Sequence, residues 1–331
     1  ILQLVARSKK KTLIDKLIDT LYQITGAYSL VILTNKKLIG VRDPYGIRPL
    51  VLGDKDGAPV LASETCALDM IGAKYIRDIE NGEIVIITEN GIESVKPFKK
   101  LKERPCIFER IYFASPDSIV GGKTVYTYRK SLGEQLSIEN NISADVVVPI
   151  PDSGVSAAIG FSQKSNIPFE LGIIRSHYVG RTFIEPSQTI RQFGVKLKHS
   201  VNRSCIENKR VILIDDSIVR GTTASKIVKM VYEAGAREVH LGISCPPIKH
   251  PDFYGIDTPN YNELIASHAN IEEMTKLVGA KSLFFLSLEG TYKAMGCEER
   301  NTNNPQFTDH CFTGEYPIDV SEILKLNSKN G

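Results

Sequence analysis

Two adjacent aspartates, Asp215 and Asp216, follow directly on a run of four branched apolar residues at 211–214. Neighbouring carboxylates repel one another and lose hydration on burial, unless a cation, a ligand or hydrogen-bond donors compensate them. The next seven residues, 217–223, are rich in hydroxyl groups, contain one glycine and lead into a helical pattern. Backbone N–H groups at the start of a helix attract anions. The sequence therefore predicts that the carboxylates hold sugar hydroxyls or a metal ion, while the loop holds a phosphate of the same ligand.

A second loop of this kind follows the apolar run at 146–150. Asp152, Ser153 and Gly154 come between that run and another apolar helical pattern. In isolation, Pro-Asp-Ser-Gly is an ordinary turn sequence. Next to the first loop, we interpret it as a second anion site, suited to pyrophosphate.

A long basic stretch at 175–198 lies between the two loops. A polar loop of this length is typical of a lid that closes over a ligand, and its cations would neutralise a polyphosphate. The alternative is a solvated basic surface. The stretch contains Arg175, Tyr178, Arg181, Arg191, Lys196 and Lys198.

The elements that must position these loops alternate between strand and helix from about residue 106 onward. Such alternation predicts a parallel sheet with helices on both faces. Ligands of these sheets bind at the carboxyl ends of the strands, where both loops fall. We expect strands within 144–151, 169–176, 209–216 and 238–247, and helices near 125–140, 153–165 and 222–236.

The first hundred residues predict a different architecture. Apolar residues at helical spacing within 12–26 indicate one amphipathic helix that ends at Gly26. An antiparallel meander follows, with a hairpin that turns at Asn90-Gly91. The Pro-flanked basic stretch at 96–105 looks like the crossing between two domains, 1–100 and 101–331. The predicted strand runs are 27–35, 37–43, 49–53, 58–64 and 82–95.

Composition indicates a soluble, folded chain. Its 331 residues suffice for about two domains, and 42% hydrophobic with 24% charged residues is ordinary. The net charge of +3 comes from 41 basic and 38 acidic residues that are mixed along the chain, so charge gives no reason to expect nucleic-acid or membrane binding. We find neither a bilayer-length apolar run nor a signal-peptide pattern, so we predict a cytoplasmic location. The six scattered cysteines predict reduced, mostly buried thiols.

VILIDDSIVRGTT at 211–223 resembles the thirteen-residue signature of the type I phosphoribosyltransferases. Together with HYVGRTFI and PPIKHPDFYGID, it resembles the glutamine phosphoribosylpyrophosphate amidotransferases. RDPYGIRPLVLG at 42–53 and ASETCALD at 62–69 resemble the later part of that family's class II glutaminase domain, and CIFERIYFASPDS resembles its inter-domain segment. The resemblance covers nearly the whole chain.

This resemblance implies an α/β type I phosphoribosyltransferase fold, preceded by the β-rich remainder of an N-terminal-nucleophile glutamine amidotransferase domain. It implies an amidophosphoribosyltransferase, which forms 5-phosphoribosylamine and pyrophosphate from phosphoribosylpyrophosphate and ammonia, in the first committed step of purine synthesis. The implied cofactor is Mg²⁺, and the implied partners are glutamine as ammonia source, purine nucleotides as feedback inhibitors and further copies of the chain. The implied lid residues are Arg175, Tyr178 and Arg181, and the implied pyrophosphate loop is Asp152, Ser153 and Gly154. The implied metal and ribose contacts are Asp215 and Asp216, with Gly154 as a further metal position. The implied 5-phosphate loop consists of Ser217, Ile218, Val219, Arg220, Gly221, Thr222 and Thr223.

The sequence also departs from the family in three places. Family members begin with a catalytic cysteine, whereas this sequence begins at Ile1, so we expect a truncated chain without glutamine-dependent activity. Where some members hold a four-iron cluster with four cysteines, Asp252 and Thr308 accompany Cys106 and Cys311, and we expect no iron–sulfur cluster. Several relatives carry a serine at the position of Gly154 that is credited with contacting magnesium, and the neighbouring Ser153 is the candidate replacement.

Other functions share parts of this pattern. A base-salvage phosphoribosyltransferase would share both loops, but no glutaminase-like neighbour. A non-catalytic sensor of phosphoribosylpyrophosphate would keep the phosphate loop without the lid, usually beside a DNA-binding segment, of which the sequence shows no sign. A scaffold subunit would be free to lose Asp215 or Asp216.

Overall fold

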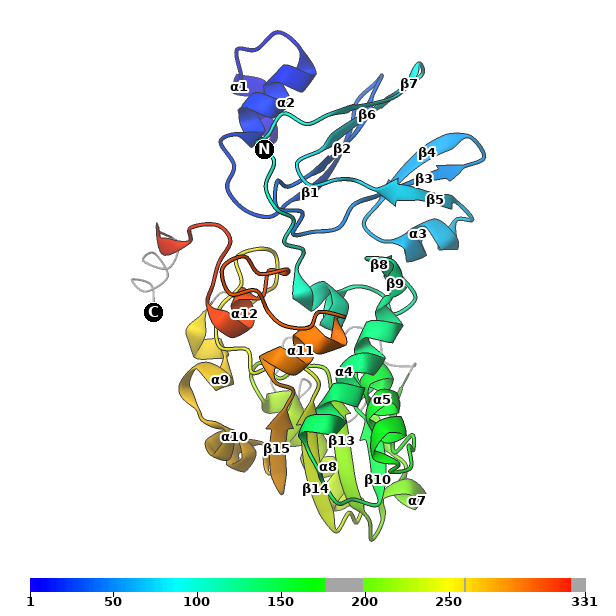
Figure 1. Cartoon of the computed structure of the whole chain (residues 1–331). Helices are drawn as coiled ribbons and strands as arrows, with labels where there is room; N and C mark the ends of the chain where they lie inside the picture. The colour runs from blue at the N-terminus through cyan, green and yellow to red at the C-terminus, as the bar shows by residue number, and fades with distance from the viewer. Residues whose placement is uncertain (177–198, 259, 323–331) are drawn as a thin grey trace, which may run out of the picture.

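Two regions of different architecture follow one another along the chain (Figure 1). The computed structural model describes residues 1–176, 199–258 and 260–322. The N-terminal region is β-rich up to residue 95, and the C-terminal region is an α/β unit that begins near residue 106. Within the described ranges, the structure contains no helix long and apolar enough to cross a membrane.

The N-terminal region begins with two helices, α1 (Leu2–Arg7) and α2 (Leu13–Leu21). The side chain of Thr12 caps α2 by accepting a hydrogen bond from the Asp15 amide. The predicted helix end at Gly26 is wrong, because α2 ends at Leu21. The β-branched Ile24 and Thr25 disfavour a further helical turn, and Gly26 lies in the following loop at φ 135°.

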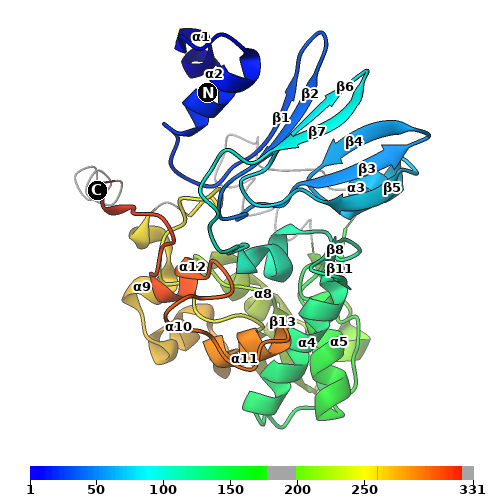
Figure 2. The same cartoon turned by 45° about the horizontal axis from the view of Figure 1, so that its top comes forward.

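Two antiparallel sheets follow, where the sequence predicted one meander (Figure 2). The predicted hairpin is confirmed, but its turn is formed by Glu89 and Asn90 rather than by Asn90 and Gly91, because Gly91 already pairs with Thr88 in the strand. The strand at 74–78 and the short helix α3 (Thr65–Met70) were not predicted. The first sheet has the order β1 (Ser29–Leu33), β2 (Leu38–Arg42), β6 (Ile84–Thr88), β7 (Gly91–Val95), and the second has the order β4 (Ala58–Ala62), β3 (Val51–Lys55), β5 (Lys74–Asp78).

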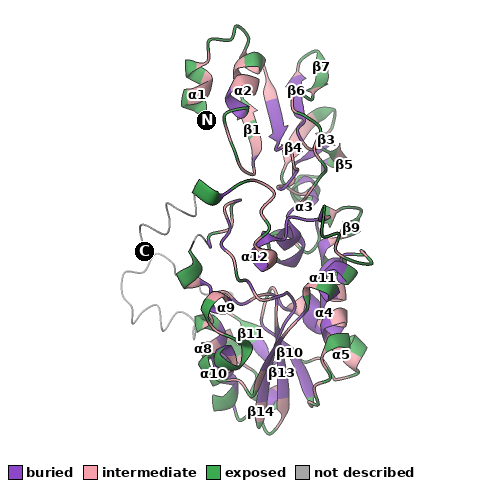
Figure 3. Cartoon of the chain, turned by 60° about the vertical axis from the view of Figure 1, so that its left-hand side comes forward, coloured by how far each residue is buried: buried purple, intermediate pink, exposed green. Residues whose placement is uncertain are grey.

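The C-terminal region is built on a four-stranded parallel sheet with helices on both faces, as predicted (Figure 3). The sheet order is β10 (Val146–Pro149), β13 (Arg210–Asp215), β14 (Glu238–Ile243), β15 (Ser282–Phe285). One face carries α4 (Val125–Glu139), α5 (Val155–Ser165) and α11 (Leu288–Ala294); the other carries α8 (Thr222–Glu233) and α10 (Ile271–Val278). Short elements complete the region: η1 (Glu109–Phe113), β8 (Ile119–Val120), β9 (Lys123–Thr124), α7 (Arg203–Ile206), η3 (Tyr261–Glu263), α9 (Ile265–His268) and α12 (His310–Thr313).

One predicted strand of the parallel sheet lies elsewhere. Residues 169–176 pair with the sheet through a bridge between Phe169 and Val147. After this bridge, β11 (Ile173–Arg175) pairs antiparallel with β12 (His199–Val201) instead of with the parallel sheet. This two-stranded ribbon stands at the base of the predicted lid.

Candidate functional site

The first predicted anion loop joins β13 to α8. β13 ends at Asp215, and α8 begins at Thr222 after Gly221, whose φ of 74° suits a residue without a side chain. Residues 217–224 line a hollow of about 240 Å³ together with Asp215. Hydroxyl groups and the start of a twelve-residue helix therefore face one small space beside the carboxylates, as a phosphate site requires.

The two aspartates lie within this turn. The Asp216 amide donates to Asp215 Oδ1 at 2.9 Å, and the Ser217 hydroxyl donates to Asp216 Oδ1. Burial raises the pKa of both carboxyls, and the neighbouring charge of Asp216 raises the pKa of Asp215 further. Hydrogen bonding to Ser153 acts in the opposite direction. In the described part of the chain, no basic side chain forms an ion pair with either carboxylate, so a bound cation would relieve their repulsion.

The second predicted anion loop joins β10 to α5 and lies beside the first. Ser153 lines the same cavity as Asp215 and Asp216. Gly154 allows close approach of the two loops, because a Cβ there would lie 2.3 Å from the Ile214 carbonyl oxygen. Gly154 has no side chain that could bind a metal, and its amide already donates a hydrogen bond to the Ile150 carbonyl. Of the two neighbours, Ser153 is the one whose side chain hydrogen-bonds to Asp215 and Asp216.

Only one of the three predicted lid residues lies within the described ranges. Arg175 ends β11 and forms an ion pair with Asp152 of the second loop. Both side chains are more than half exposed. Tyr178 and Arg181 lie outside the described residues, and their role stays a prediction.

A cavity of about 330 Å³ connects these parts. Three aromatic side chains, Phe108, Tyr112 and Phe113, form one wall of it. Ile256 and Thr258 belong to another wall, from the segment after β14. Sequence reasoning singled out the segment at 106–118 only as an inter-domain resemblance; its three closely spaced aromatic residues were the available signal.

The region of Cys106 and Cys311 is closely packed. Both thiols are buried, and burial raises their pKa. Asp252 Oδ2 lies 2.8 Å from Nε2 of His310, and the Thr308 hydroxyl donates to the Arg104 carbonyl at 2.6 Å. Across residues 1–176, 199–258 and 260–322, no three His, Cys, Asp or Glu side chains are grouped so as to hold a metal ion. Any metal at Asp215 and Asp216 would thus need further ligands from substrate or water.

Comparisons with known proteins agree with this arrangement. The family model described as a glutamine amidotransferase domain matches residues 2–70, and that described as a phosphoribosyl transferase domain matches residues 130–254. The amidophosphoribosyltransferase of Rhizobium etli is 58% identical over all of this chain and 67% of its own length. The chain belongs to the amidophosphoribosyltransferase family. Its likeness extends to the enzyme of Bacillus subtilis, 47% identical over 98% of this chain and 68% of that protein.

Solved structures show the same fold for this family member. The glutamine phosphoribosylpyrophosphate amidotransferase of B. subtilis, complexed with ADP and GMP, matches with a TM-score of 0.90 and 47% identity, over 97% of this chain and 70% of that one. The chain spans about two thirds of the R. etli relative, and 56% of a chloroplastic relative from Glycine max. The type I phosphoribosyltransferase fold and its glutamine amidotransferase neighbour are thereby confirmed, while a boundary at residue 100 stays a prediction.

Proposed function

We propose that this chain transfers the 5-phosphoribosyl group of phosphoribosylpyrophosphate to ammonia, giving 5-phosphoribosylamine and pyrophosphate, as a step of purine biosynthesis. The observation that supports this most is the position of the Asp215–Asp216 pair between two anion loops at one cavity. Membership of the amidophosphoribosyltransferase family supports the choice of ammonia over a purine or pyrimidine base.

In this proposal, the two loops and the acid pair each bind a different part of phosphoribosylpyrophosphate. Hydroxyl and amide groups of Ser217 to Thr223 hold the 5-phosphate, while Asp215 and Asp216 accept hydrogen bonds from the ribose hydroxyls. The loop of Asp152 to Gly154 holds the pyrophosphate, with Arg175 beside it. This division leaves the anomeric carbon inside the cavity, next to the aromatic wall.

The carboxylates also fit a magnesium ion. Two adjacent buried carboxyls that form no direct ion pair with a basic side chain in the described structure suit a hard cation that keeps several oxygen ligands from substrate and water. Such an ion would neutralise charge on the departing pyrophosphate. The Ser153 hydroxyl, which hydrogen-bonds to both carboxyls, is a candidate for a further oxygen ligand.

The reaction needs charge stabilisation rather than a strong base. The bond from the anomeric carbon to the pyrophosphate oxygen breaks with its electron pair, and positive charge develops on the ribose ring. The nitrogen lone pair of ammonia forms the new bond to the anomeric carbon, and a proton of the resulting ammonium group passes to solvent. The residues of the two loops hold both phosphate ends still while this happens.

Partners and location follow as further parts of the proposal. Purine nucleotides are expected as inhibitors, which is supported by the B. subtilis structure complexed with ADP and GMP. We expect a homo-oligomer, a cytoplasmic location and no iron–sulfur cluster. Glutamine as the source of ammonia stays a prediction drawn from the family resemblance.

The test is pyrophosphate release from phosphoribosylpyrophosphate and Mg²⁺ as ammonium chloride is raised at a fixed alkaline pH. The proposal expects release that depends on both ammonia and Mg²⁺. Release that is independent of ammonia, but stimulated by a purine or pyrimidine base, would favour a salvage enzyme. Tight substrate binding without release would favour a sensor.

A further inference from the structure

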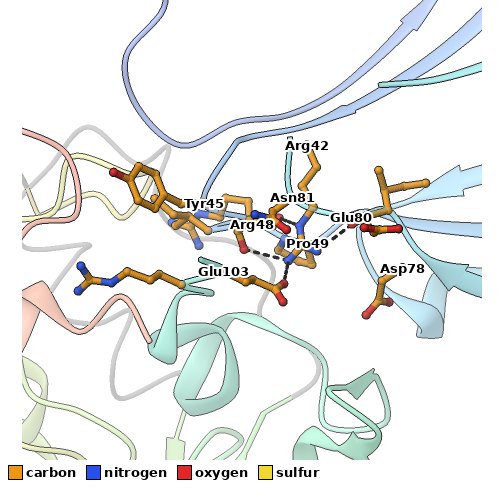
Figure 4. Close-up of polar contacts among 12 residues, drawn as sticks. Arg42, Tyr45, Arg48, Pro49, Asp78, Glu80, Asn81 and Glu103 are labelled. Carbon is orange, nitrogen blue, oxygen red and sulfur yellow. Dashed lines mark hydrogen bonds and ion pairs between the residues drawn. The ribbon is translucent and has the colours of Figure 1, made fainter. Parts of the chain in front are cut away.

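Arg48 belongs to the N-terminal region but extends its side chain to the walls of the cavity in the C-terminal region. Hydrogen bonds with Asp43 and Arg42 hold the backbone of the Arg48 loop. The buried carboxylate of Asp43 accepts hydrogen bonds from the amides of Tyr45, Ile47 and Arg48, at 3.0–3.4 Å. Arg42 donates from Nε to the Arg48 carbonyl at 2.9 Å (Figure 4). The loop that carries Arg48 is therefore held by its own charged residues.

The Arg48 guanidinium then contacts two separate segments. Its Nη1 donates to Glu109 Oε1 at 2.7 Å, and its Nε donates to the Tyr254 carbonyl at 2.8 Å. It also lies over the ring of Phe113, 5.2 Å from the centroid. A Cβ on Gly255 would lie 3.1 Å from Nη2, so the second segment approaches the guanidinium closely.

These two segments are walls of the same cavity. Residues 106–113, the first wall, contribute Phe108, Tyr112 and Phe113 to its lining. Residues 252–258, the second wall, contribute Ile256 and Thr258. Arg48 itself does not line the cavity, so it acts through the walls rather than on a bound ligand.

The charge of Arg48 matters because Glu109 is largely buried. Burial raises the pKa of Glu109, while the Arg48 guanidinium lowers it. The two side chains are only 15% and 12% exposed. Removal of Arg48 would leave a buried acid without its partner, which favours displacement of η1 toward solvent.

We propose that Arg48 is a positioning residue for the phosphoribosyl transfer, which holds the first and second walls at the separation that the reaction requires. This inference rests on the proposed function, since the walls matter for catalysis only if the cavity holds the reacting ribose. It also explains how the N-terminal region would contribute to turnover even when free ammonia is the nitrogen donor.

Hydrogen–deuterium exchange of Arg48→Met, followed by mass spectrometry of the whole chain, tests the contact without an activity assay. Exchange should rise roughly tenfold in peptides from both walls, the effect of losing a charge-assisted hydrogen bond. Glu109→Gln should raise exchange in the first wall alone, because the bond to Tyr254 remains. The matched control is Arg77→Met, which removes another Arg–Glu pair of the N-terminal region, 2.6 Å long, whose hydrogen bonds reach Asp78 and Glu83 and neither wall.

Kinetics with ammonia complete the test. The kcat of Arg48→Met should fall roughly tenfold while the KM for phosphoribosylpyrophosphate stays within twofold, because the anion loops are untouched. Arg48→Lys should recover part of kcat, since it keeps the charge beside Glu109.

Unchanged exchange in either wall of Arg48→Met, or an equal rise of exchange in Arg77→Met, would overturn the proposal. A wild-type protein without turnover would instead contradict the proposed function, and the exchange result would still decide the wall contacts.

Discussion

At the scale of single residues, the proposed site depends most on Asp215 and Asp216. Their position could be predicted from the sequence, because two acids at the end of a buried strand are unfavourable unless they bind something. The aromatic side chains Phe108, Tyr112 and Phe113 could not be placed at the cavity in this way. They reach it through packing between segments far apart in the chain, which leaves no local pattern.

Replacing one of these acids should impair transfer. Asp215→Asn or Asp216→Asn should lower kcat/KM for phosphoribosylpyrophosphate by roughly thirtyfold, since one charged contact contributes about 2 kcal/mol. Asp145→Asn is the matched control: its carboxylate pairs with Arg210 at the opposite end of β13, at 2.7 Å. Wild-type kcat/KM in either site variant would contradict the assignment.

The same acids should lower the stability of the substrate-free protein. Burial raises the pKa of Asp215 in the folded state, so above pH 4 or so the folded chain binds more protons than the unfolded chain. The free energy of unfolding contributed by this group therefore falls as pH rises through that raised pKa. Without Mg²⁺, Asp215→Asn should unfold at a higher temperature than wild type at neutral pH, with the difference disappearing below pH 4 or so.

Thermal unfolding with and without Mg²⁺ checks this prediction. Mg²⁺ should raise the Tm of the wild type more than that of Asp215→Asn, because the variant has lost one anionic ligand. A variant that is less stable than wild type at neutral pH would show that the acid is compensated within the folded chain.

At the scale of elements, the strand–loop–helix units at β13–α8 and β10–α5 match their sequence predictions closely. Apolar strand runs and helical periodicity are local signals, so these units could be predicted. β15 was missed and β11 was placed in the wrong sheet, because a short apolar run does not say which strand it pairs with. The close approach of the two loops at Gly154 likewise depends on tertiary packing.

Gly154→Ala tests that close approach. The added methyl group would lie 2.3 Å from the Ile214 carbonyl oxygen, which belongs to β13 and cannot move without disturbing the sheet. We expect a loss of roughly 1–3 kcal/mol in the free energy of unfolding, measured by urea denaturation. Ser153→Ala is the comparison: it adds no atom at the contact between the loops, so it should cost less stability than Gly154→Ala, and it should weaken the effect of Mg²⁺. Equal stability of wild type and Gly154→Ala would mean that the loops lie farther apart.

At the scale of the whole molecule, the N-terminal region contacts the walls of a cavity that residues of the C-terminal region line. The family models cover residues 2–70 and 130–254, and the segment between them contains the aromatic wall and much of the contact between the regions. Sequence resemblance identified both domains, because their motifs are local. It did not reveal that the RDPYGIRP loop holds the cavity walls through Arg48, because that contact joins residues about two hundred positions apart.

Cofactor content is a property of the whole molecule as well. Asp252 and Thr308 accompany Cys106 and Cys311, and both side chains are engaged with other partners. Protein purified without oxygen should therefore contain neither stoichiometric iron nor acid-labile sulfide. A broad visible absorption band with bound iron would show that other ligands complete a cluster.

Transfer itself is tested most directly by incubating the chain with phosphoribosylpyrophosphate, Mg²⁺ and ¹⁵N-labelled ammonia at alkaline pH, and following ³¹P and ¹⁵N signals together. The account predicts that pyrophosphate and a ¹⁵N-labelled phosphoribosylamine appear in equal amounts, and that both are strongly reduced in Asp216→Asn. Release of pyrophosphate without ¹⁵N in the sugar product, or equal rates in wild type and Asp216→Asn, would contradict it.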